Sequence, residues 1–362
     1  MAKKALMVVS FGTTIPQARR AIEQVEQKLR AAFPDHDFYR AFTSGMVARK
    51  IEREEGIFIP SPAELLEQLA ADGYDEVRCQ SLHIIFGQEY EKLLAQLMPF
   101  HGRFARLLVG QPLLWDTADY LRLTRALLAE MPRLDTDEAF VFMGHGTDHP
   151  ANAAYALVEN CFRYHRAERV YVGTVEGFPH LDYVLARLDA HEVTRVHLAP
   201  LMLVAGDHAQ NDLAGDGDDS WKSRLEGEGY TVETHLRGLG ELDAVAEISA
   251  DHCRAAQRMD GTYRAITGGR WSRPPVFLSQ PRRQQEKLPK GYSRFHFPAK
   301  PVHLLGYTGS TREAGQTWTS KKPNGARRSS SAVRRPGRRN IGKRNTCARW
   351  RPACSGLSCA QC

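Results

Sequence analysis

The sequence predicts an α/β protein of two similar domains, each built on a parallel sheet, followed by a disordered basic C-terminal tail. Three observations predict it: an internal duplication, an alternation of strands and helices, and a change of composition near residue 258. The repeated unit exceeds 100 residues, so it is a duplicated domain rather than a solenoid repeat. A chain of 362 residues has room for both copies and for the tail.

The duplication is visible in three pairs of segments. With the first half named first, these are Val8–Thr13 with Phe142–Thr147, Tyr39–Gly45 with Tyr171–Gly177, and Val77–Glu89 with Val196–His208. At three positions the halves carry different side chains: Phe11 pairs with His145, Ser44 with Glu176, and Glu89 with His208. The repeat therefore predicts two facing domains with the chemistry concentrated on one wall of the cleft between them.

The predicted strands are short apolar runs, as expected for parallel strands covered on both faces. They are Ala5–Ser10, Asp37–Phe42, Glu76–Leu82, Phe104–Val109, Ala139–Met143, Arg169–Gly173, Thr194–Pro200 and Tyr230–Leu236. Helices are predicted between them, and alternating strands and helices imply right-handed crossovers. Ligands of such sheets bind at the carboxyl ends of the strands.

Three of the predicted helices begin with a proline, which is favoured in a first turn. They are Pro16–Leu29, with Thr14 near its cap, and the matching pair Pro62–Ala71 and Pro179–Leu188. In the first of these the apolar residues fall on one stripe at helical spacing.

The expected domains are residues 1–133 and 134–238. Apolar residues at helical spacing also predict a helix over Glu241–Gln257. We expect this helix, within residues 239–257, to pack back on the first domain.

Residues 258–362 differ sharply from the rest of the chain. They hold 23 of the 49 Lys and Arg residues but only three of the 42 acidic residues. Low complexity and the absence of an amphipathic period predict disorder. Two interpretations are open: a nucleic-acid-binding tail, or translation past a lost stop codon or in a shifted frame. The second is favoured, and the spacing of the four terminal cysteines matches no standard zinc site.

The sequence predicts a cytoplasmic protein without a membrane segment. No apolar run is long enough to cross a bilayer, and the five-residue run Ala5–Val9 is too short for a signal peptide. The scattered Cys79, Cys161 and Cys253 are typical of reduced thiols.

His145, Glu176 and His208 form the candidate metal site. Each is expected just after a strand, in a turn flanked by glycine, at the same edge of the second sheet. Two imidazoles and a carboxylate suit a first-row metal ion and leave coordination positions open. A single histidine after a strand is more often a loop or core residue, so the hypothesis depends on all three occurring together.

Glu89 is the one matching position of the first half that kept an ionisable group. It would face the histidines from the opposite wall and accept protons or steer a cation. Alternatively it is a helix N-terminal carboxylate stabilised by the helix dipole. His83, in the same segment, either lines the cleft or has a buried structural role.

Other catalytic signatures are missing: the sequence has no GxGxxG, Walker, GxSxG or HExxH motif. Five motifs together resemble those of the anaerobic sirohydrochlorin cobaltochelatases, the CbiK-type class II chelatases. They are Ser10-Phe-Gly-Thr-Thr14, Gln80-Ser-Leu-His83 with Gly87-Gln-Glu-Tyr-Glu-Lys92, Gly144-His-Gly-Thr147, Gly173-Thr-Val-Glu-Gly177 and Pro200-Leu-Met-Leu-Val-Ala-Gly-Asp-His208. The resemblance covers about residues 3–257, so the tail departs from the family pattern.

The resemblance implies two α/β domains around a tetrapyrrole cleft and insertion of Co²⁺ into sirohydrochlorin on the anaerobic cobalamin route. It implies metal binding by His145, Glu176 and His208, with Glu89 as a further active-site residue. We expect His145 to accept a pyrrole proton with help from Glu89. We also assign Ser10, Phe11, Gly12 and His83 to the tetrapyrrole cleft. The partners are then sirohydrochlorin and a divalent metal, with no organic cofactor and no ATP.

Several alternatives stay open. The same ligands accept Fe²⁺ or Ni²⁺, and iron insertion would serve siroheme instead. A non-catalytic metal- or tetrapyrrole-binding protein is a different class of function. Nucleic-acid binding rests on the tail alone and is disfavoured. A homo-oligomer is compatible with the sequence.

Overall fold

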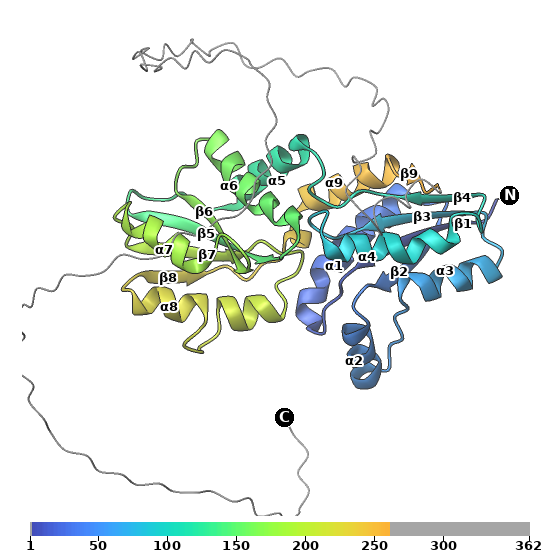
Figure 1. The fold of residues 1–362 in the computed structure, drawn as a ribbon, viewed down its shortest axis with the longest axis horizontal. Coiled ribbons are helices and arrows are strands. Elements are labelled where there is room, and N and C mark those ends of the chain that lie inside the picture. The colour runs from blue at the N-terminus through green and yellow to red at the C-terminus, as the bar shows by residue number, and fades with distance from the viewer. Residues whose placement is uncertain (1, 261–362) are drawn as a thin grey trace, which may run out of the picture. The chain divides into compact units, whose positions relative to one another are not determined.

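The first sheet is formed by the N-terminal half and closed by a short C-terminal strand (Figure 1). The computed structural model describes residues 2–260, which belong to one compact unit. The strand order is β2-β1-β3-β4-β9, and the first four strands are parallel. The five strands are β1 (Lys4–Ser10), β2 (Asp37–Phe42), β3 (Glu76–Ser81), β4 (Arg106–Val109) and β9 (Gln257–Arg258).

The second sheet repeats the topology of the first. Its order is β6-β5-β7-β8, and all its strands are parallel. The strands are β5 (Glu138–Gly146), β6 (Val170–Glu176), β7 (Arg195–Pro200) and β8 (Thr231–Thr234). All eight predicted strands are therefore present, and the matching order of β1–β4 and β5–β8 is the structural form of the duplication.

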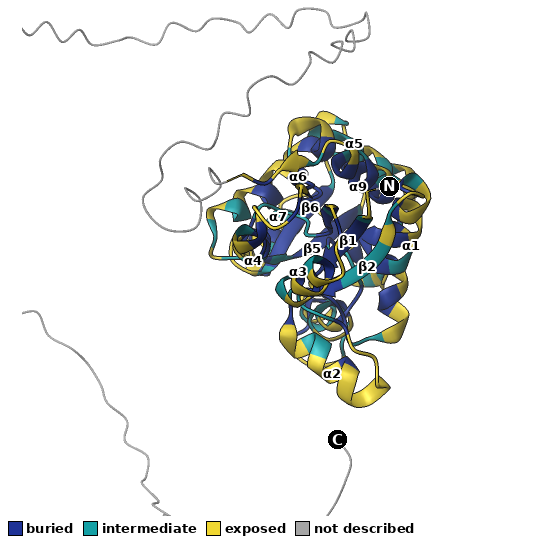
Figure 2. Cartoon of the chain, turned by 90° about the vertical axis from the view of Figure 1, so that its right-hand side faces the viewer, coloured by how far each residue is buried: buried dark blue, intermediate teal, exposed yellow. Residues whose placement is uncertain are grey.

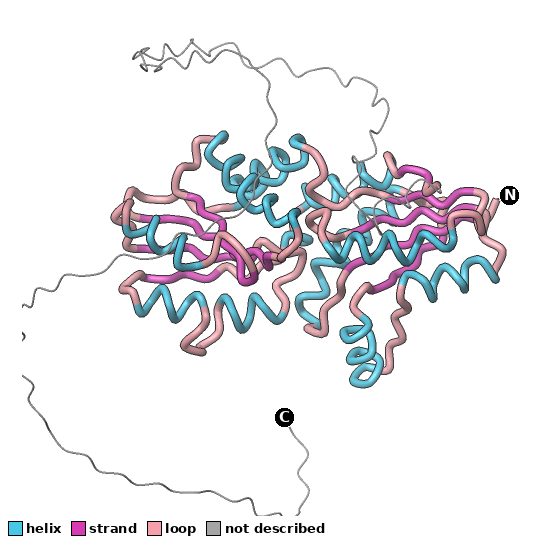
Figure 3. The backbone as a smooth tube through the Cα atoms, viewed as in Figure 1, coloured by secondary structure: helices cyan, strands magenta, loops and turns pink. Residues whose placement is uncertain are grey.

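Nine α-helices connect and cover the strands of the described chain (Figure 3). They are α1 (Pro16–Ala32), α2 (Gly45–Glu55), α3 (Pro62–Ala71), α4 (Gln88–Leu97), α5 (Thr117–Glu130), α6 (Ala153–Tyr164), α7 (Leu181–Asp189), α8 (Trp221–Gly227) and α9 (Asp243–Arg254). Within residues 2–260, no helix combines the length and apolar character needed to cross a membrane.

One predicted helix start is wrong. Helix α7 begins at Leu181 because the His180 side chain accepts a hydrogen bond from the Tyr183 amide and caps the helix, which leaves Pro179 outside. Helix α1 begins at Pro16 as predicted, with Ile15 at its N-cap and Thr14 directly before it. The Thr13 hydroxyl accepts a hydrogen bond from the Ile15 amide just before that helix.

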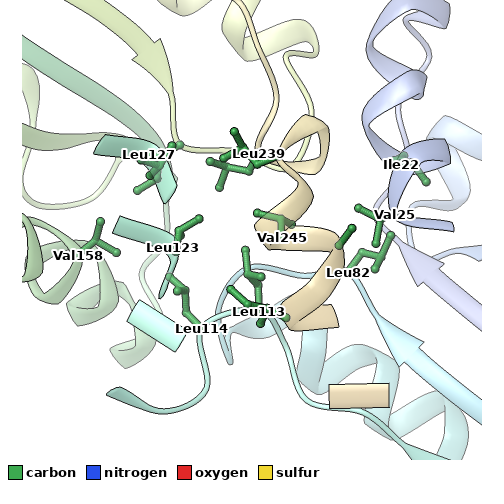
Figure 4. Close-up of a cluster of buried hydrophobic side chains, with 14 of the residues drawn as sticks. Ile22, Val25, Leu82, Leu113, Leu114, Leu123, Leu127, Val158, Leu239 and Val245 are labelled. Carbon is green, nitrogen blue, oxygen red and sulfur yellow. The ribbon is translucent and has the colours of Figure 1, made fainter. Parts of the chain in front are cut away.

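One apolar core joins the two halves. Figure 4 shows Val25 of α1 and Leu82 of the first half near Val245 of α9, with Leu123 of α5 and Val158 of α6 on the other side. As expected, α9 packs back on the first half, where it contacts α1 and β3, and it also contacts α5. Figure 2 shows the strands buried beneath helices whose outer faces are exposed.

The division into domains at residues 133 and 238 stays a proposal, because both sheets lie in one compact unit. The expected start of the tail at residue 258 is wrong. Arg258 lies in β9, antiparallel to β4, and the buried Met259 donates its amide hydrogen to the Leu107 carbonyl at 2.8 Å. A two-residue strand is too short to produce a sequence pattern. The disorder expected for residues 261–362 lies outside the described residues.

Met259 should therefore contribute to stability. Its side chain is 1% exposed and packs in the core of the first sheet, so Met259→Ala should lower the free energy of unfolding by about 2–4 kcal/mol. Urea denaturation measures this change, with the exposed Gln257→Ala as the control. A loss below about 0.5 kcal/mol for Met259→Ala would show that the fold ends before this residue.

Candidate active site

A cleft of about 690 Å³ lies at the carboxyl ends of the strands and is lined by both halves of the chain. Leu82 follows β3 and Leu201 follows β7, and these two residues occupy matching positions of the duplication. Both are buried core residues that also line the cleft. The apolar core is thus the floor of the cleft. The volume of the cleft falls in the range of small-molecule sites, about 300–1,000 Å³.

His145, Glu176 and His208 all line this cleft. His145 and Glu176 belong to the last residues of β5 and β6, rather than to turns after them as expected, because both strands run further than predicted. His208 follows β7 through a loop. The imidazole centroids of His145 and His208 are 4.7 Å apart, and Glu176 Oε2 is 3.9 Å from His145 Nδ1.

The backbone at Gly146 permits this approach. Gly146 has φ +83° and pairs with Glu176 across β5 and β6. A Cβ atom at this position would lie 1.5 Å from the Glu176 carbonyl oxygen, which is backbone and cannot move aside cheaply. Only glycine lets the two strand ends come this close, and their proximity brings the side chain of His145 beside that of Glu176.

Each histidine is oriented by a hydrogen bond to its Nδ1. His145 Nδ1 lies 2.9 Å from the Gly146 carbonyl, which can only accept, so this nitrogen carries the hydrogen. His208 Nδ1 lies 2.5 Å from Asp212 Oδ2 and donates to that carboxylate in the same way. In the neutral form both rings are left with a lone pair on Nε2, the arrangement typical of metal-binding histidines.

Asp212 was missed by the sequence analysis. It lies in the π-helical turn Ala209–Leu213, which places its carboxylate four residues after His208 and on the same side. The signal that would have found it is a carboxylate at i+4 from a candidate ligand, a spacing at which helical side chains meet.

The three candidate ligands are near one another but not closed around a common point. Their ligand atoms do not all lie within 4.8 Å of one another in the described chain. Their side chains are 45% (His145), 64% (Glu176) and 40% (His208) exposed. Such an open set can take up a metal ion and release it, which a closed structural site does poorly.

Glu89 lies on the opposite wall, in the first turn of α4, and lines the cleft. This position fits both interpretations of Glu89: it is a helix N-terminal carboxylate, and it faces the histidines across the cleft. One carboxylate oxygen accepts a hydrogen bond from Lys92 Nζ at 2.5 Å, and the other accepts from the Thr43 hydroxyl at 3.1 Å. Thr43, which directly follows β2, was not identified from the sequence.

His83 continues the same hydrogen-bonded chain and also lines the cleft. Its Nε2 is 3.3 Å from Thr43 Oγ1, and its Nδ1 is 2.8 Å from the Ser81 hydroxyl. Burial lowers the pKa of His83 to about 4, although the Glu89 charge acts in the opposite direction. The imidazole is therefore neutral at pH 7. A consistent direction results: Ser81 donates to His83, His83 to Thr43, and Thr43 to Glu89.

Phe11 and Gly12 line the cleft as assigned, but Ser10 does not. Ser10 is 2% exposed and points into the protein, because successive side chains of a strand alternate between its faces. Phe11, 46% exposed, presents an apolar ring at the position that His145 holds in the other half. Met46 of α2 is 72% exposed and extends this apolar wall.

The comparisons with known proteins agree with this arrangement. The family model described as cobalt chelatase (CbiK) matches residues 4–258. A sirohydrochlorin cobaltochelatase of Salmonella typhimurium is 46% identical over 258 residues, covering 71% of this chain and 97% of the relative. The sirohydrochlorin cobaltochelatase CbiKC of Nitratidesulfovibrio vulgaris is 37% identical over 260 residues, with coverages of 71% and 91%.

Among solved structures, SirB from Bacillus subtilis with Fe³⁺ has a similar fold. The TM-score is 0.50 at 13% identity, over 70% of this chain and 94% of that one. The likeness in fold extends across both sheets, and the family match covers the cleft with all its ionisable residues. The chain belongs to the CbiK family of cobalt chelatases.

Proposed function

We propose that this protein is a sirohydrochlorin cobaltochelatase, which inserts Co²⁺ into sirohydrochlorin on the anaerobic route to cobalamin. The observation that carries the proposal is the convergence of His145, Glu176 and His208 on one wall of a cleft with Glu89 on the other. Relatives that match at 46% and 37% identity bear the name of this activity. A cytoplasmic location is part of the proposal.

The metal ion is a substrate in this reaction. Nε2 of His145, Nε2 of His208 and the Glu176 carboxylate would hold it before transfer. Two imidazoles and one carboxylate leave positions for water and for the incoming pyrrole nitrogens. Because the ligands are exposed and not closed around one point, the ion can leave them for the macrocycle.

Insertion exchanges two pyrrole protons for one divalent ion. His145 offers a single lone pair, since its Nδ1–H is held by the Gly146 carbonyl. The same Nε2 atom therefore cannot hold the metal and accept a proton at the same time. We infer an order in which transfer of the ion frees Nε2, which then accepts one proton. Glu89, on the opposite wall, is placed to accept the second.

The substrate carries many carboxylates, so a cation at the cleft is expected. Among the cleft-lining residues of the described chain, Lys50 of α2 is the only lysine or arginine. Lys50 lies on α2, the helix whose Met46 extends the apolar wall. Figure 1 shows α2 projecting from the rest of the protein. We assign Lys50 to a substrate carboxylate, with Phe11 and Met46 against the macrocycle.

The experiment is an anaerobic absorbance time course with sirohydrochlorin and Co²⁺, Fe²⁺ or Ni²⁺, each against a sample without protein. Enzyme-dependent conversion fastest with Co²⁺ is expected. Fastest conversion with Fe²⁺ would contradict the cobalt assignment, and a spectral shift only stoichiometric with protein would identify a binding protein instead.

His145→Ala should lower the insertion rate by about 100-fold or more while sirohydrochlorin binding changes little, because one side chain supplies both a ligand and a proton acceptor. Rates come from the absorbance assay and binding from fluorescence titration. His165→Ala, at the end of α6, is the matched control. Turnover that survives in His145→Ala would exclude its role as proton acceptor.

Asp212→Asn should weaken Co²⁺ binding about 10- to 100-fold, as for other carboxylates that orient a metal-binding imidazole. Loss of the charge removes the constraint on the His208 ring and its tautomer. Competition against a chelating dye measures the affinity. The exposed Asp218→Asn serves as the control, and equal affinities of the two variants would show that His208 needs no such partner.

Lys50→Gln should raise KM for sirohydrochlorin about two- to fivefold, the effect of one exposed ion pair, with kcat nearly unchanged. The difference from the unaltered protein should shrink as salt is added, because salt screens exposed charges. Lys28→Gln on α1 removes an equally charged residue paired with Glu247, away from the cleft. A lower kcat at unchanged KM would contradict a binding role for Lys50.

A further inference from the structure

A second group of metal-ligand residues lies outside the cleft, at the edge of the second sheet. His197 belongs to β7, Glu233 to the edge strand β8, and His235 follows β8 directly. One ligand atom from each lies within 4.8 Å of the others, and no further group of three in residues 2–260 meets this condition. None of the three lines the cleft.

The spacing of these atoms is close to that around a bound ion. His197 Nδ1 and His235 Nε2 are 3.1 Å apart. The Glu233 carboxylate places Oε2 3.6 Å from His197 Nδ1 and Oε1 3.8 Å from His235 Nε2. Ligands bound tetrahedrally at about 2.0–2.1 Å lie about 3.3–3.4 Å apart. Shifts of a few tenths of an ångström would thus close the group around one ion.

The far side of the His197 ring supports the same interpretation. His197 is 5% exposed, yet its Nε2 has no hydrogen-bond partner. An oxygen of the Glu138 carboxylate lies 3.7 Å from this nitrogen. An ion on Nδ1 requires the hydrogen on Nε2, where it points toward Glu138, and such carboxylates commonly support metal-binding histidines.

Both imidazoles are held in place by one aromatic ring. The ring of Phe140 in β5 stacks on both imidazoles. Its centroid lies 5.9 Å from that of His197, with an angle of 11° between the ring planes, and 5.5 Å from that of His235, with an angle of 19°. His235 also lines a cavity of about 380 Å³ near the end of α5, so the group can be reached from solvent. The arrangement combines fixed rings with an open side for water as a further ligand.

We propose that His197, Glu233 and His235 bind a first-row divalent transition-metal ion at a second site, distinct from the cleft. The ion would join β8 to β7, where the His235 amide already donates a hydrogen bond to the Leu198 carbonyl at 2.8 Å. Its effect is on stability rather than on insertion. The proposal does not depend on the chelatase activity.

The test uses Co²⁺ and the full chain carrying His145→Ala and His208→Ala, which removes the cleft ligands. Two further proteins add His235→Ala or, as the matched control, the exposed His101→Ala. Equilibrium dialysis counts bound Co²⁺, and visible absorption reports its coordination. Metal held elsewhere in the chain is common to all three proteins. We expect the His235→Ala protein to bind one Co²⁺ ion fewer per chain and to lose the absorption band of that ion. The His101→Ala protein should keep the ion and its band.

Equal binding by the His235→Ala and His101→Ala proteins would overturn the site and leave the two imidazoles as a hydrogen-bonded pair. Glu233→Gln keeps the shape of its side chain and should weaken the same equivalent about tenfold; unchanged affinity would remove the carboxylate from the ligand set. Co²⁺ should also raise the Tm of the protein that carries only His145→Ala and His208→Ala, but not the Tm of the protein with His235→Ala added. Equal increases would contradict the proposed link between β7 and β8.

Discussion

The apolar core shared by the two sheets is the interaction on which the cleft depends. Residues of α1, α5, α6 and α9 pack there in one cluster, and two of its members, Leu82 and Leu201, are also the floor of the cleft. Because protein interiors are close-packed and resist compression, this core sets the distance between the wall that carries His145, Glu176 and His208 and the wall that carries Glu89. A rigid floor suits a planar, stiff ligand, which needs a fixed gap more than an adaptable one.

Most of the fold and the principal site residues could be predicted because both follow from short-range patterns. Buried parallel strands give apolar runs, and the carboxyl ends of such strands meet at one edge, which is why His145, Glu176 and His208 were found together. The failures have physical causes as well. Ser10 was misassigned because adjacent residues of a strand face opposite sides, and β9 is too short to leave a pattern. Thr43 meets Glu89, and Lys50 reaches the cleft, only through the tertiary placement of their segments.

The two walls differ in chemistry although they share a scaffold. One carries two imidazoles, each with Nδ1–H fixed by an acceptor, and an exposed carboxylate beside them. The other carries an apolar ring and a carboxylate at the end of a hydrogen-bonded chain. The imidazoles and the apolar ring are thus on opposite sides of the gap. A planar ligand between the walls would meet a different environment on each of its faces.

The same left-handed glycine follows the cleft residue in both halves: Gly12 at φ +93° after Phe11, and Gly146 at φ +83° after His145. The backbone conformation at this glycine therefore directs the preceding side chain into the cleft, whatever the chemistry of that side chain. After a duplication, one such position can change while the other keeps its old role, and neither change disturbs the sheet. The two halves thus share one duplicated scaffold and differ in a few side chains that line the cleft. Substitutions at these positions can change the chemistry of the cleft without changing the fold.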